Sequence, residues 1–395
     1  MAQEPELLAH GLDDHAQPVP LFLARAWPGS RTRFGNRRDH APCRDPIEAV
    51  AFLELETTMS IQHSIQTYAL DAQTHIRLAD GFADFQLPTA ISAVDAAVSD
   101  AVDRWRRLAP PALLAATTAM ADGRGAAAVL VTNLPFDPTL THGPEDTDQE
   151  MVCKPSRLSE GLLLGAAGHV GAPYGVAPEG RGLINNLSPR RRDRSALTGL
   201  GSREPLDLHI ETAAARRCSG DPCADGLALI GLVADPSGAP ATRVADARAA
   251  FERLSPEDQA VLRQARYSIS LPKRWLGEGE TRRQVCAIVA GEDEDLSFAF
   301  AFYGDMTLPL DAEAGAVLTR FHAALDSVAG EVILQPGMLL LINNRVAGHG
   351  RGAFEPSYTA DGAPIRWVQR VFWIRDLRRL GAWRELSGRV FQPTL

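Results

Sequence analysis

The chain has 395 residues, 45% hydrophobic and 23% charged, which is enough for one large core with additions. Its net charge of −9 and pI near 5.6 argue against nucleic acid or an anionic membrane surface as the main partner. Neither a membrane-spanning apolar segment nor a basic-then-apolar signal pattern occurs, and five scattered cysteines are typical of reduced thiols, so we expect a cytoplasmic protein.

The first 58 residues differ from the rest of the chain. Prolines recur before residue 47, a basic run occupies 31–38, and no periodicity is sustained. Such a composition favours an extension without fixed structure. We therefore predict that residues 1–58 are poorly ordered and that 59–395 form a single domain. Whether residues 1–58 belong to the native protein stays open, because Met59 is an alternative start.

Helices and strands alternate irregularly up to the middle of the chain. Three- and four-residue spacing of apolar side chains predicts helices, and short apolar runs predict strands. In order, the predicted elements are a helix within 88–107, a helix at 112–121, a buried strand at 127–132, a helix at 157–167, a mobile connection at 171–182, a short strand at 183–187 and a strand at 206–212.

Strands dominate the second half. They are predicted at 227–233, 242–244, 285–289, 296–303, 339–343 and 366–374, with helices at 245–254, from Pro256 onward and at 312–329. Ser255 is expected to cap the helix that begins at Pro256. No repeat period occurs. These elements predict an α+β fold in which a single β-sandwich or jelly-roll core carries flanking helices.

The segment 206–212 points most directly to chemistry. Apolar and polar residues alternate through it, so His209 and Glu211 are expected on one face of a strand, about 7 Å apart along the backbone. An imidazole and a carboxylate held on a rigid strand supply two of the three ligands of a metal site. Alone, such a pair is more often an ordinary surface pair, and ten histidines offer many chance partners.

His349 is the histidine best placed to complete this site. It follows the apolar run 338–342 and a turn-like segment. Two histidines and one carboxylate form the facial triad of non-haem iron(II) oxygenases, which leaves coordination positions open. Arg366 and Arg370 come next on a predicted strand whose alternate residues are apolar, as expected for a strand that lines a cavity. The sequence therefore predicts an iron(II) site.

Three blocks of sequence, in fixed order, carry a family resemblance. They are 183–189 with 198–202 and 206–211, then 335–345 continuing to 349–351, and finally 366–370. In their order and spacing, residues 126–374 resemble the clavaminate-synthase-like branch of the Fe(II)/2-oxoglutarate-dependent oxygenases. This branch is part of the TauD-related superfamily. That branch includes amino-acid hydroxylases, so the resemblance implies a double-stranded β-helix (jelly-roll) core with flanking helices.

The resemblance also implies a cofactor, a co-substrate and their ligands. His209, Glu211 and His349 match the family's iron ligands, with 2-oxoglutarate and O2 taking the remaining positions. Arg366 matches the arginine that pairs with the distal carboxylate of 2-oxoglutarate, and Thr242 matches a supporting hydroxyl. The segment 357–364 is about three residues longer than the family form, so the match depends on Arg366 and the tryptophan after it.

Substrate residues follow from the same resemblance. Asn185 and Asn186 occupy positions where relatives hold the amino acid, Arg370 matches a residue near its carboxylate, and Glu211 is expected to accept its α-ammonium. Relatives that act on basic amino acids carry two acids near 302–305, whereas Asp305 is the one acid here. A single carboxylate suits an amide or one ammonium better than a guanidinium. We therefore expect a polar or singly cationic L-amino acid.

Hydroxylation of a free or carrier-bound L-amino acid, with succinate and CO2 as co-products, is the expected activity. Desaturation or cyclisation in natural-product biosynthesis stays open, as does a catalytically inactive binding or sensing domain. Glu211 argues against a halogenase, which needs a small residue there, and no HExxH motif supports a zinc hydrolase. Nucleic acid and membrane are not expected as partners, and the oligomeric state is not predicted.

Overall fold

The computed structural model describes residues 59–62, 64–88, 90–144, 157–179, 182–196, 201–237, 240–276, 280–292 and 295–394. These residues belong to one compact unit, Glu54–Leu395. The prediction for residues 1–58 lies outside the described residues, as do residues 198–200 of the first family block.

The helices, with the short 3-10 turns that bear on the site, are α1 (Ala72–Phe82), α2 (Ile91–Leu108), α3 (Pro111–Ala121), α4 (Arg157–Val170), η2 (Ala177–Glu179), α5 (Ala247–Glu252), α6 (Pro256–Leu262), η5 (Lys273–Trp275) and α7 (Ala312–Val328). The strands are β1 (Met59–Gln62), β2 (Ile65–Ala69), β3 (Ala128–Thr132), β4 (Ala172–Val176), β5 (Asn185–Leu187), β6 (Leu206–His209), β7 (Gly226–Val233), β8 (Thr242–Asp246), β9 (Tyr267–Ser270), β10 (Arg283–Cys286), β11 (Val289–Ala290), β12 (Ser297–Phe298), β13 (Thr307–Pro309), β14 (Gly330–Val332), β15 (Leu339–Asn343), β16 (Ala347–Arg351), β17 (Trp367–Ile374), β18 (Arg384–Ser387) and β19 (Val390–Gln392). None of the described helices is long and apolar enough to cross a bilayer.

A ten-stranded sheet forms the largest layer. Its order is β1-β2-β3-β15-β7-β17-β4-β19-β18, and β5 pairs with β17 beside β7. The central pairs β15–β7 and β7–β17 are antiparallel. Strands β7, β15 and β17 are buried along nearly their whole length, so each reads in sequence as an almost continuous apolar run.

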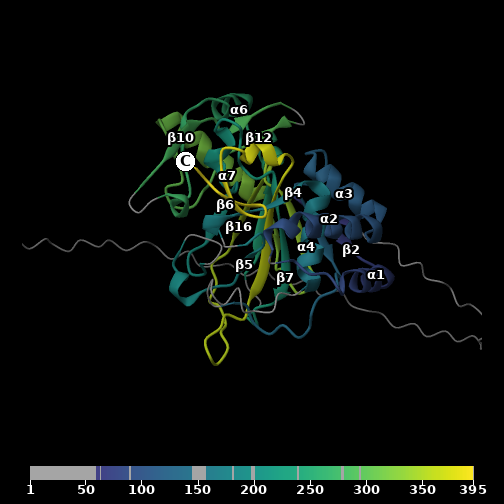
Figure 1. Ribbon diagram of the computed structural model, residues 1–395. Helices are drawn as coiled ribbons and strands as arrows, with labels where there is room; N and C mark the ends of the chain where they lie inside the picture. Colours follow the sequence, from purple (N-terminus) through teal and green to yellow (C-terminus); the bar gives the residue numbers. More distant parts are fainter. Residues whose placement is uncertain are drawn as a thin grey trace, which may run out of the picture. The chain divides into compact units, whose positions relative to one another are not determined.

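Helices α1 to α4 lie together on one side of this sheet (Figure 1). The spacing in α2 explains the packing, because Val94, Val98, Ala101 and Trp105 fall on one face and are all buried. They join one cluster with sheet residues such as Trp373. The sheet face toward the helices is therefore core, and its other face is free to meet a second sheet.

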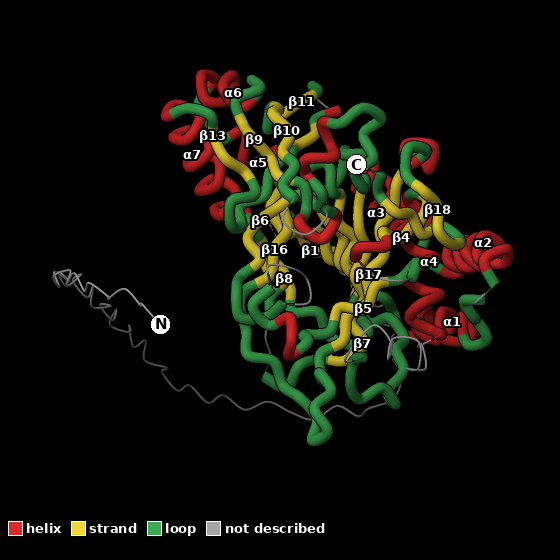
Figure 2. The backbone as a smooth tube through the Cα atoms, turned by 60° about the vertical axis from the view of Figure 1, so that its left-hand side comes forward, coloured by secondary structure: helices red, strands yellow, loops and turns green. Residues whose placement is uncertain are grey.

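That second sheet has four strands in the order β14-β8-β16-β6. Figure 2 shows β6, β16 and β8 opposite β17, β5 and β7. Apolar residues of both sheets, among them Val244, Ala347, Leu340 and Phe372, form one buried cluster between them. Strands and helices are thus mixed in layers, as the predicted α+β class requires.

A further lobe packs behind β6 and β16. It consists of α5, α6 and α7 with the small sheet β10-β9-β13, around a core that includes Phe298 and Phe321. Helix α7 begins where the Asp311 side chain accepts a hydrogen bond from the Ala314 amide at 2.9 Å. The predicted cap at Ser255 is confirmed, since its side chain accepts from the Asp258 amide at 3.2 Å.

Several predicted elements were wrong or incomplete. The expected mobile connection 171–182 contains β4 and η2, because its prolines occupy positions that a strand edge and a turn tolerate. The predicted strand 296–303 is reduced to β12 and an isolated bridge at Ala301. The predicted strand 206–212 ends at His209.

Candidate active site

Three predicted ligands lie together at the meeting point of β6 and β16. His209 ends β6 and faces His349 in the antiparallel register, with their ring centroids 4.3 Å apart. Glu211 lies just beyond the strand end. One ligand atom from each of the three residues lies within 4.8 Å of the others, and all three residues are buried. Two imidazoles and one carboxylate converge as a donor set that suits a divalent transition metal.

Hydrogen bonding orients the first imidazole. His209 Nδ1 lies 2.8 Å from the backbone carbonyl oxygen of Asp207, so Nδ1 carries the proton and donates it. Nε2 then keeps its lone pair toward Glu211, whose Oε2 is 4.0 Å away. Burial, together with neighbouring His349, lowers the pKa of His209 to about 3. The ring is therefore neutral at physiological pH, which is the state that binds a metal.

Glu211 reaches the site from an irregular backbone. Thr212 adopts a left-handed φ of 55°, which ends the extended geometry that the alternating sequence predicted. The Asn344 side chain holds this turn, because its Oδ1 accepts from the Glu211 amide at 2.7 Å and its Nδ2 donates to the Glu211 carbonyl at 3.2 Å. Since Asn344 lies between β15 and β16, the turn that leads into the His349 strand also holds Glu211.

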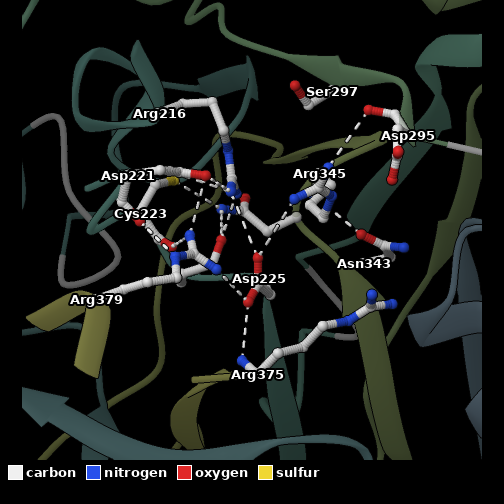
Figure 3. Close-up of polar contacts among 12 residues, drawn as sticks. Arg216, Asp221, Cys223, Asp225, Asp295, Ser297, Asn343, Arg345, Arg375 and Arg379 are labelled. Carbon is white, nitrogen blue, oxygen red and sulfur yellow. Dashed lines mark hydrogen bonds and ion pairs between the residues drawn. The ribbon is translucent and has the colours of Figure 1, made fainter. Parts of the chain in front are cut away.

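Figure 3 shows a network of charged groups around Asp225, and Cys223 connects this network to Glu211. Asp225 is fully buried and accepts a hydrogen bond from Arg379 Nη1 at 2.6 Å, while Arg216 Nη1 is 3.5 Å away. The Cys223 thiol donates to the Glu211 carbonyl at 3.1 Å. The backbone of the metal-facing carboxylate therefore rests on a charged and hydrogen-bonded layer.

A cavity lies between the two sheets at the three ligands. Strands β5, β6, β7, β8, β16 and β17 contribute to its wall. Its lining residues are Leu187, Leu206, His209, Glu211, Leu227, Leu229, Thr242, Arg274, Tyr303, Leu334, His349, Gly350, Arg351, Arg366, Val368 and Arg370. The wall is thus apolar with a few charged groups, as expected for a small-molecule site.

Two buried arginines mark one part of the cavity. No described carboxylate lies within ion-pair distance of Arg366, and its guanidinium sits 5.8 Å from the Phe354 ring centre. Burial and nearby Arg351 lower the pKa of Arg366 to about 10, so it is still charged at neutral pH. Arg351 donates to the carbonyls of Ser202 and Glu204 at 3.3 and 3.1 Å.

Thr242 lies beside this pair, opposite Arg351 in the register of β8 and β16. It is buried and lines the cavity. The structure therefore brings together the residues that the resemblance matched to the distal carboxylate. It adds Arg351 as a second cation, and buried positive charge without a counter-ion is suited to an anionic ligand.

A chain of ion pairs crosses the other part of the cavity. Arg370 Nη1 lies 3.3 Å from Glu211 Oε2, and its Nη2 lies 3.1 Å from Glu179 Oε2. Arg274 donates from Nε to Glu179 Oε1 at 2.6 Å and places Nη2 3.4 Å from Glu211. Burial favours the neutral acid, yet Arg370 and the two histidines hold the pKa of Glu211 below its ordinary value.

The predicted substrate residues are not all at the cavity. Asn186 faces the helices, where its Oδ1 accepts from Trp367 Nε1 at 2.8 Å, because it has the opposite parity to Leu187 on β5. Asn185 is buried opposite Arg370, and its amide has no hydrogen-bond partner among the described residues. Asp305 is exposed over 68% of its side chain and lines an adjoining hollow that shares Arg274 and Tyr303 with the cavity.

Glu179, Arg274 and Asn344 were missed as site residues. Glu179 stands in a proline- and glycine-rich stretch and Arg274 in a short 3-10 turn, so no periodic pattern marked either one. Asn344 lies in the turn-like segment before His349, and no sequence pattern indicates its contacts with Glu211. A signal existed for Arg351, since it follows His349 by two residues on one strand and so shares its face.

Comparison with known proteins supports the family resemblance. Residues 203–372 match the model of the taurine catabolism dioxygenase TauD, TfdA family. An L-asparagine oxygenase from Streptomyces coelicolor is 29% identical over 265 residues, covering 67% of this chain and 75% of the relative. An L-lysine 3-hydroxylase from Catenulispora acidiphila is 30% identical over 227 residues, covering 56% and 60%.

Solved structures agree. Asparagine oxygenase in complex with Fe(II), a 3-hydroxyasparagine and succinate superposes with a TM-score of 0.71 at 25% identity, covering 83% of this chain and 99% of that one. The non-haem iron oxygenase OrfP, in complex with Fe, succinate and (3S)-hydroxy-L-Arg, shares the fold with a TM-score of 0.70 at 22% identity, covering 82% and 99%. The resemblance predicted from the sequence is confirmed: residues 203–372 match the TauD/TfdA family of dioxygenases, and the similar proteins are amino-acid oxygenases and hydroxylases.

Proposed function

We propose that this protein is an Fe(II)- and 2-oxoglutarate-dependent dioxygenase that hydroxylates a carbon of a polar L-amino acid. The observation that carries the proposal is one cavity in which His209, Glu211 and His349 converge and Arg366 has no counter-ion among the described residues. Named relatives that act on asparagine and lysine support the amino-acid class. Succinate and CO2 are the expected co-products.

The metal is assigned to the two histidines and Glu211. Their chemistry fits iron(II), because imidazole and carboxylate are its usual ligands and three protein groups leave open positions. Bound with 2-oxoglutarate, iron(II) supplies the activation of O2 that an unactivated C–H bond requires. The protein itself orients the ligands. The Asp207 carbonyl fixes the His209 tautomer, and the Asn344 side chain accepts from the Glu211 N–H and donates to the Glu211 carbonyl.

The co-substrate and substrate are assigned to different arginines. Arg366, supported by Thr242 and Arg351, is proposed to hold the distal carboxylate of 2-oxoglutarate through its planar fork. Arg370 is proposed to bind the α-carboxylate of a free amino acid. Its Nη1 lies 3.3 Å from Glu211 Oε2, so its guanidinium group is next to the proposed metal site. Glu211 and buried Asn185 remain proposed contacts of the amino acid, and carrier-bound substrate is the alternative.

Architecture and location are proposed on the same basis. We interpret the two facing sheets as a double-stranded β-helix, in line with the likeness to asparagine oxygenase. Residues 59–395 are proposed to act as one catalytic domain. A cytoplasmic location stays a prediction from the cysteine pattern. The described cysteines, Cys218, Cys223 and Cys286, form no disulfides with one another.

Other outcomes of the same chemistry are retained. Desaturation and cyclisation begin, like hydroxylation, with removal of a substrate hydrogen, so the product decides among them. An inactive binding domain is the non-enzyme alternative, and O2-dependent turnover would exclude it.

One experiment tests the proposal. Protein reconstituted with iron(II) and 2-oxoglutarate under nitrogen is mixed with single amino acids, then exposed to air, and succinate and product mass are measured. We expect at least one amino acid to raise succinate formation together with a gain of one oxygen atom in the product. Iron binding with no amino-acid-dependent succinate would contradict it.

A further inference from the structure

Arginines outnumber acids around the cavity. Its wall carries the guanidinium groups of Arg274, Arg351, Arg366 and Arg370, whereas the acids in contact with them are Glu211, in the wall, and Glu179, at its edge. Among the described lining residues there is no further aspartate or glutamate. Four guanidinium groups thus face two carboxylates, so the wall of the cavity retains an excess of positive charge.

Loading the site as proposed does not remove this excess. Iron(II) is dipositive and 2-oxoglutarate dianionic, so the two cancel, and the head of a free amino acid is a neutral zwitterion. The charge of the substrate side chain therefore decides the electrostatic balance. In a buried site of low dielectric, a side-chain carboxylate is stabilised by the surplus guanidinium groups, and an ammonium or guanidinium is repelled.

Arg274 is the guanidinium left for that side chain, because Arg366 and Arg370 already have proposed anionic partners. It stands in η5 at the cavity wall. Its Nε and Nη2 are directed at Glu179 and Glu211, and no described residue accepts a hydrogen bond from Nη1. Although burial opposes the charge, the two glutamates hold the pKa of Arg274 above its ordinary value.

The carboxylate expected to receive a cationic side chain is elsewhere. Asp305 is largely exposed, and its Oδ2 lies 3.9 Å from Arg283 Nη1 on β10. It lines the adjoining hollow, which shares Arg274 and Tyr303 with the cavity. Glu179 is the nearest alternative acid, but two arginines already share it. Within the cavity, a lysine or arginine side chain would thus meet Arg274, while Glu179 and Glu211 are already paired with arginines.

We infer that the substrate is an acidic L-amino acid whose side-chain carboxylate accepts hydrogen bonds from Arg274. This inference rests on the proposed function and narrows it, and it departs from the polar or singly cationic side chain expected from the sequence. Asparagine and glutamine are the matched neutral comparisons, because each has the shape of one acid without its charge.

Equilibrium binding tests the inference apart from turnover. The protein loaded with iron(II) and 2-oxoglutarate is titrated under nitrogen with aspartate, glutamate, asparagine, glutamine, lysine and arginine, using isothermal calorimetry. At least one acid should bind about 10- to 100-fold more tightly than its own amide, the range expected for one charge-assisted hydrogen-bonded contact. Comparing aspartate with glutamate shows which length fits.

Variants assign the effect to Arg274. Arg274→Gln should reduce the ratio of acid to amide affinity to about one and raise KM for the acid, whereas Arg274→Lys should retain part of the preference. Lys273→Gln is the matched control, because it removes the same charge from the neighbouring exposed residue of η5. It should leave the ratio at its wild-type value.

The outcomes are separable. If an amide, lysine or arginine binds more tightly than both acids and is hydroxylated, the inference is wrong while the proposed function stands. An acid preference that survives Arg274→Gln would also overturn the assignment. Absence of succinate formation with every amino acid would overturn the proposed function, and this inference with it.

Discussion

The two histidines at the strand crossing give the most direct test of the metal assignment. His209→Ala and His349→Ala each remove one of three ligands, so iron retention after anaerobic dialysis should fall strongly and 2-oxoglutarate turnover should be abolished. His142→Ala is the control, since His142 lies in a loop outside the cavity lining. Near-normal iron content in either ligand variant would show that the triad is misassigned.

Arg366 should control affinity for the co-substrate. Arg366→Ala leaves a buried carboxylate of 2-oxoglutarate without its main partner, a cost of about 3–5 kcal/mol, so affinity should drop by orders of magnitude while iron binding persists. Arg366→Lys keeps the charge but loses the planar fork, so its affinity for 2-oxoglutarate should lie between that of the wild type and that of Arg366→Ala. If Arg370→Ala gives this phenotype instead, the assumed position of the longer loop before β17 is incorrect.

Asn344 should matter for the metal although it does not reach it. Asn344→Ala leaves the buried Glu211 amide without an acceptor, costing about 1–3 kcal/mol and loosening the carboxylate, so iron affinity should fall. Asn343→Ala is a matched control, because Asn343 is equally buried in the same turn but donates to Met120 on α3. Both should lose stability, and only the Asn344 variant should lose iron.

At the scale of single residues, the sequence best predicted the site residues that lie on or next to regular strands. Arg370 follows from its parity with Arg366 along the predicted strand 366–374, and His349 follows from its place after a buried apolar run and a turn. Glu179 and Arg274 could not be predicted in this way, because short 3-10 turns carry no periodic pattern and only tertiary packing brings the two together. When a residue faces a cavity from irregular backbone, only the three-dimensional structure shows its place in the site.

Helix α4 offers a prediction on pH and stability. Glu160 is buried in its first turn, and burial raises its pKa from 4.5 to about 7. The folded protein thus binds a proton that the unfolded chain has released, so stability falls as pH rises between these values. Glu160→Gln should be more stable than the wild type above about pH 7, by on the order of 2–3 kcal/mol, and similar below about pH 4.5.

Urea unfolding at the two pH values checks this. Glu252→Gln, at an exposed position on α5, is the control and should follow the wild type at both. A wild type that gains stability relative to Glu160→Gln as pH rises would show that Glu160 is ionised and paired in the folded protein.

Whole elements were predicted best where one face is buried. The α2 pattern and the apolar runs of β7 and β15 were recognised because burial imposes periodicity or continuity. Short strands such as β4 and β12 were missed or overextended, since strands of two to five residues leave little trace in composition. Strand β6 ends early because a side-chain amide from a distant turn, not local propensity, sets the backbone after it.

At the scale of the molecule, Asp225 joins segments that are far apart in sequence. It accepts from the Arg375 amide at 2.8 Å and from Arg379, while the Asn344 amide donates to its carbonyl at 2.9 Å (Figure 3). Asp225→Asn should leave buried guanidinium groups uncompensated and lower the free energy of unfolding by about 3–5 kcal/mol. Iron affinity should weaken with it, because the same layer supports Glu211.

Denaturant unfolding of Asp225→Asn alongside Asp376→Asn separates burial from charge. Asp376 pairs with Arg378 at 2.8 Å, but that pair is at the surface, so its loss should leave stability near the wild-type value. Equal losses in the two variants would mean that the buried network contributes no more than a surface pair.

Strand β17 has a consequence for how such a molecule can diversify. Val368 and Arg370 face the cavity, whereas Trp367 and Trp373 pack against the helices. One residue inserted within the strand would exchange these faces and inactivate the protein in a single step. The loop before it tolerates added length without disturbing register. The strand that carries Arg370 is therefore constrained by its register. The turns η2 and η5, which carry Glu179 and Arg274, can change without shifting that register, so substrate preference can change while β17 stays the same.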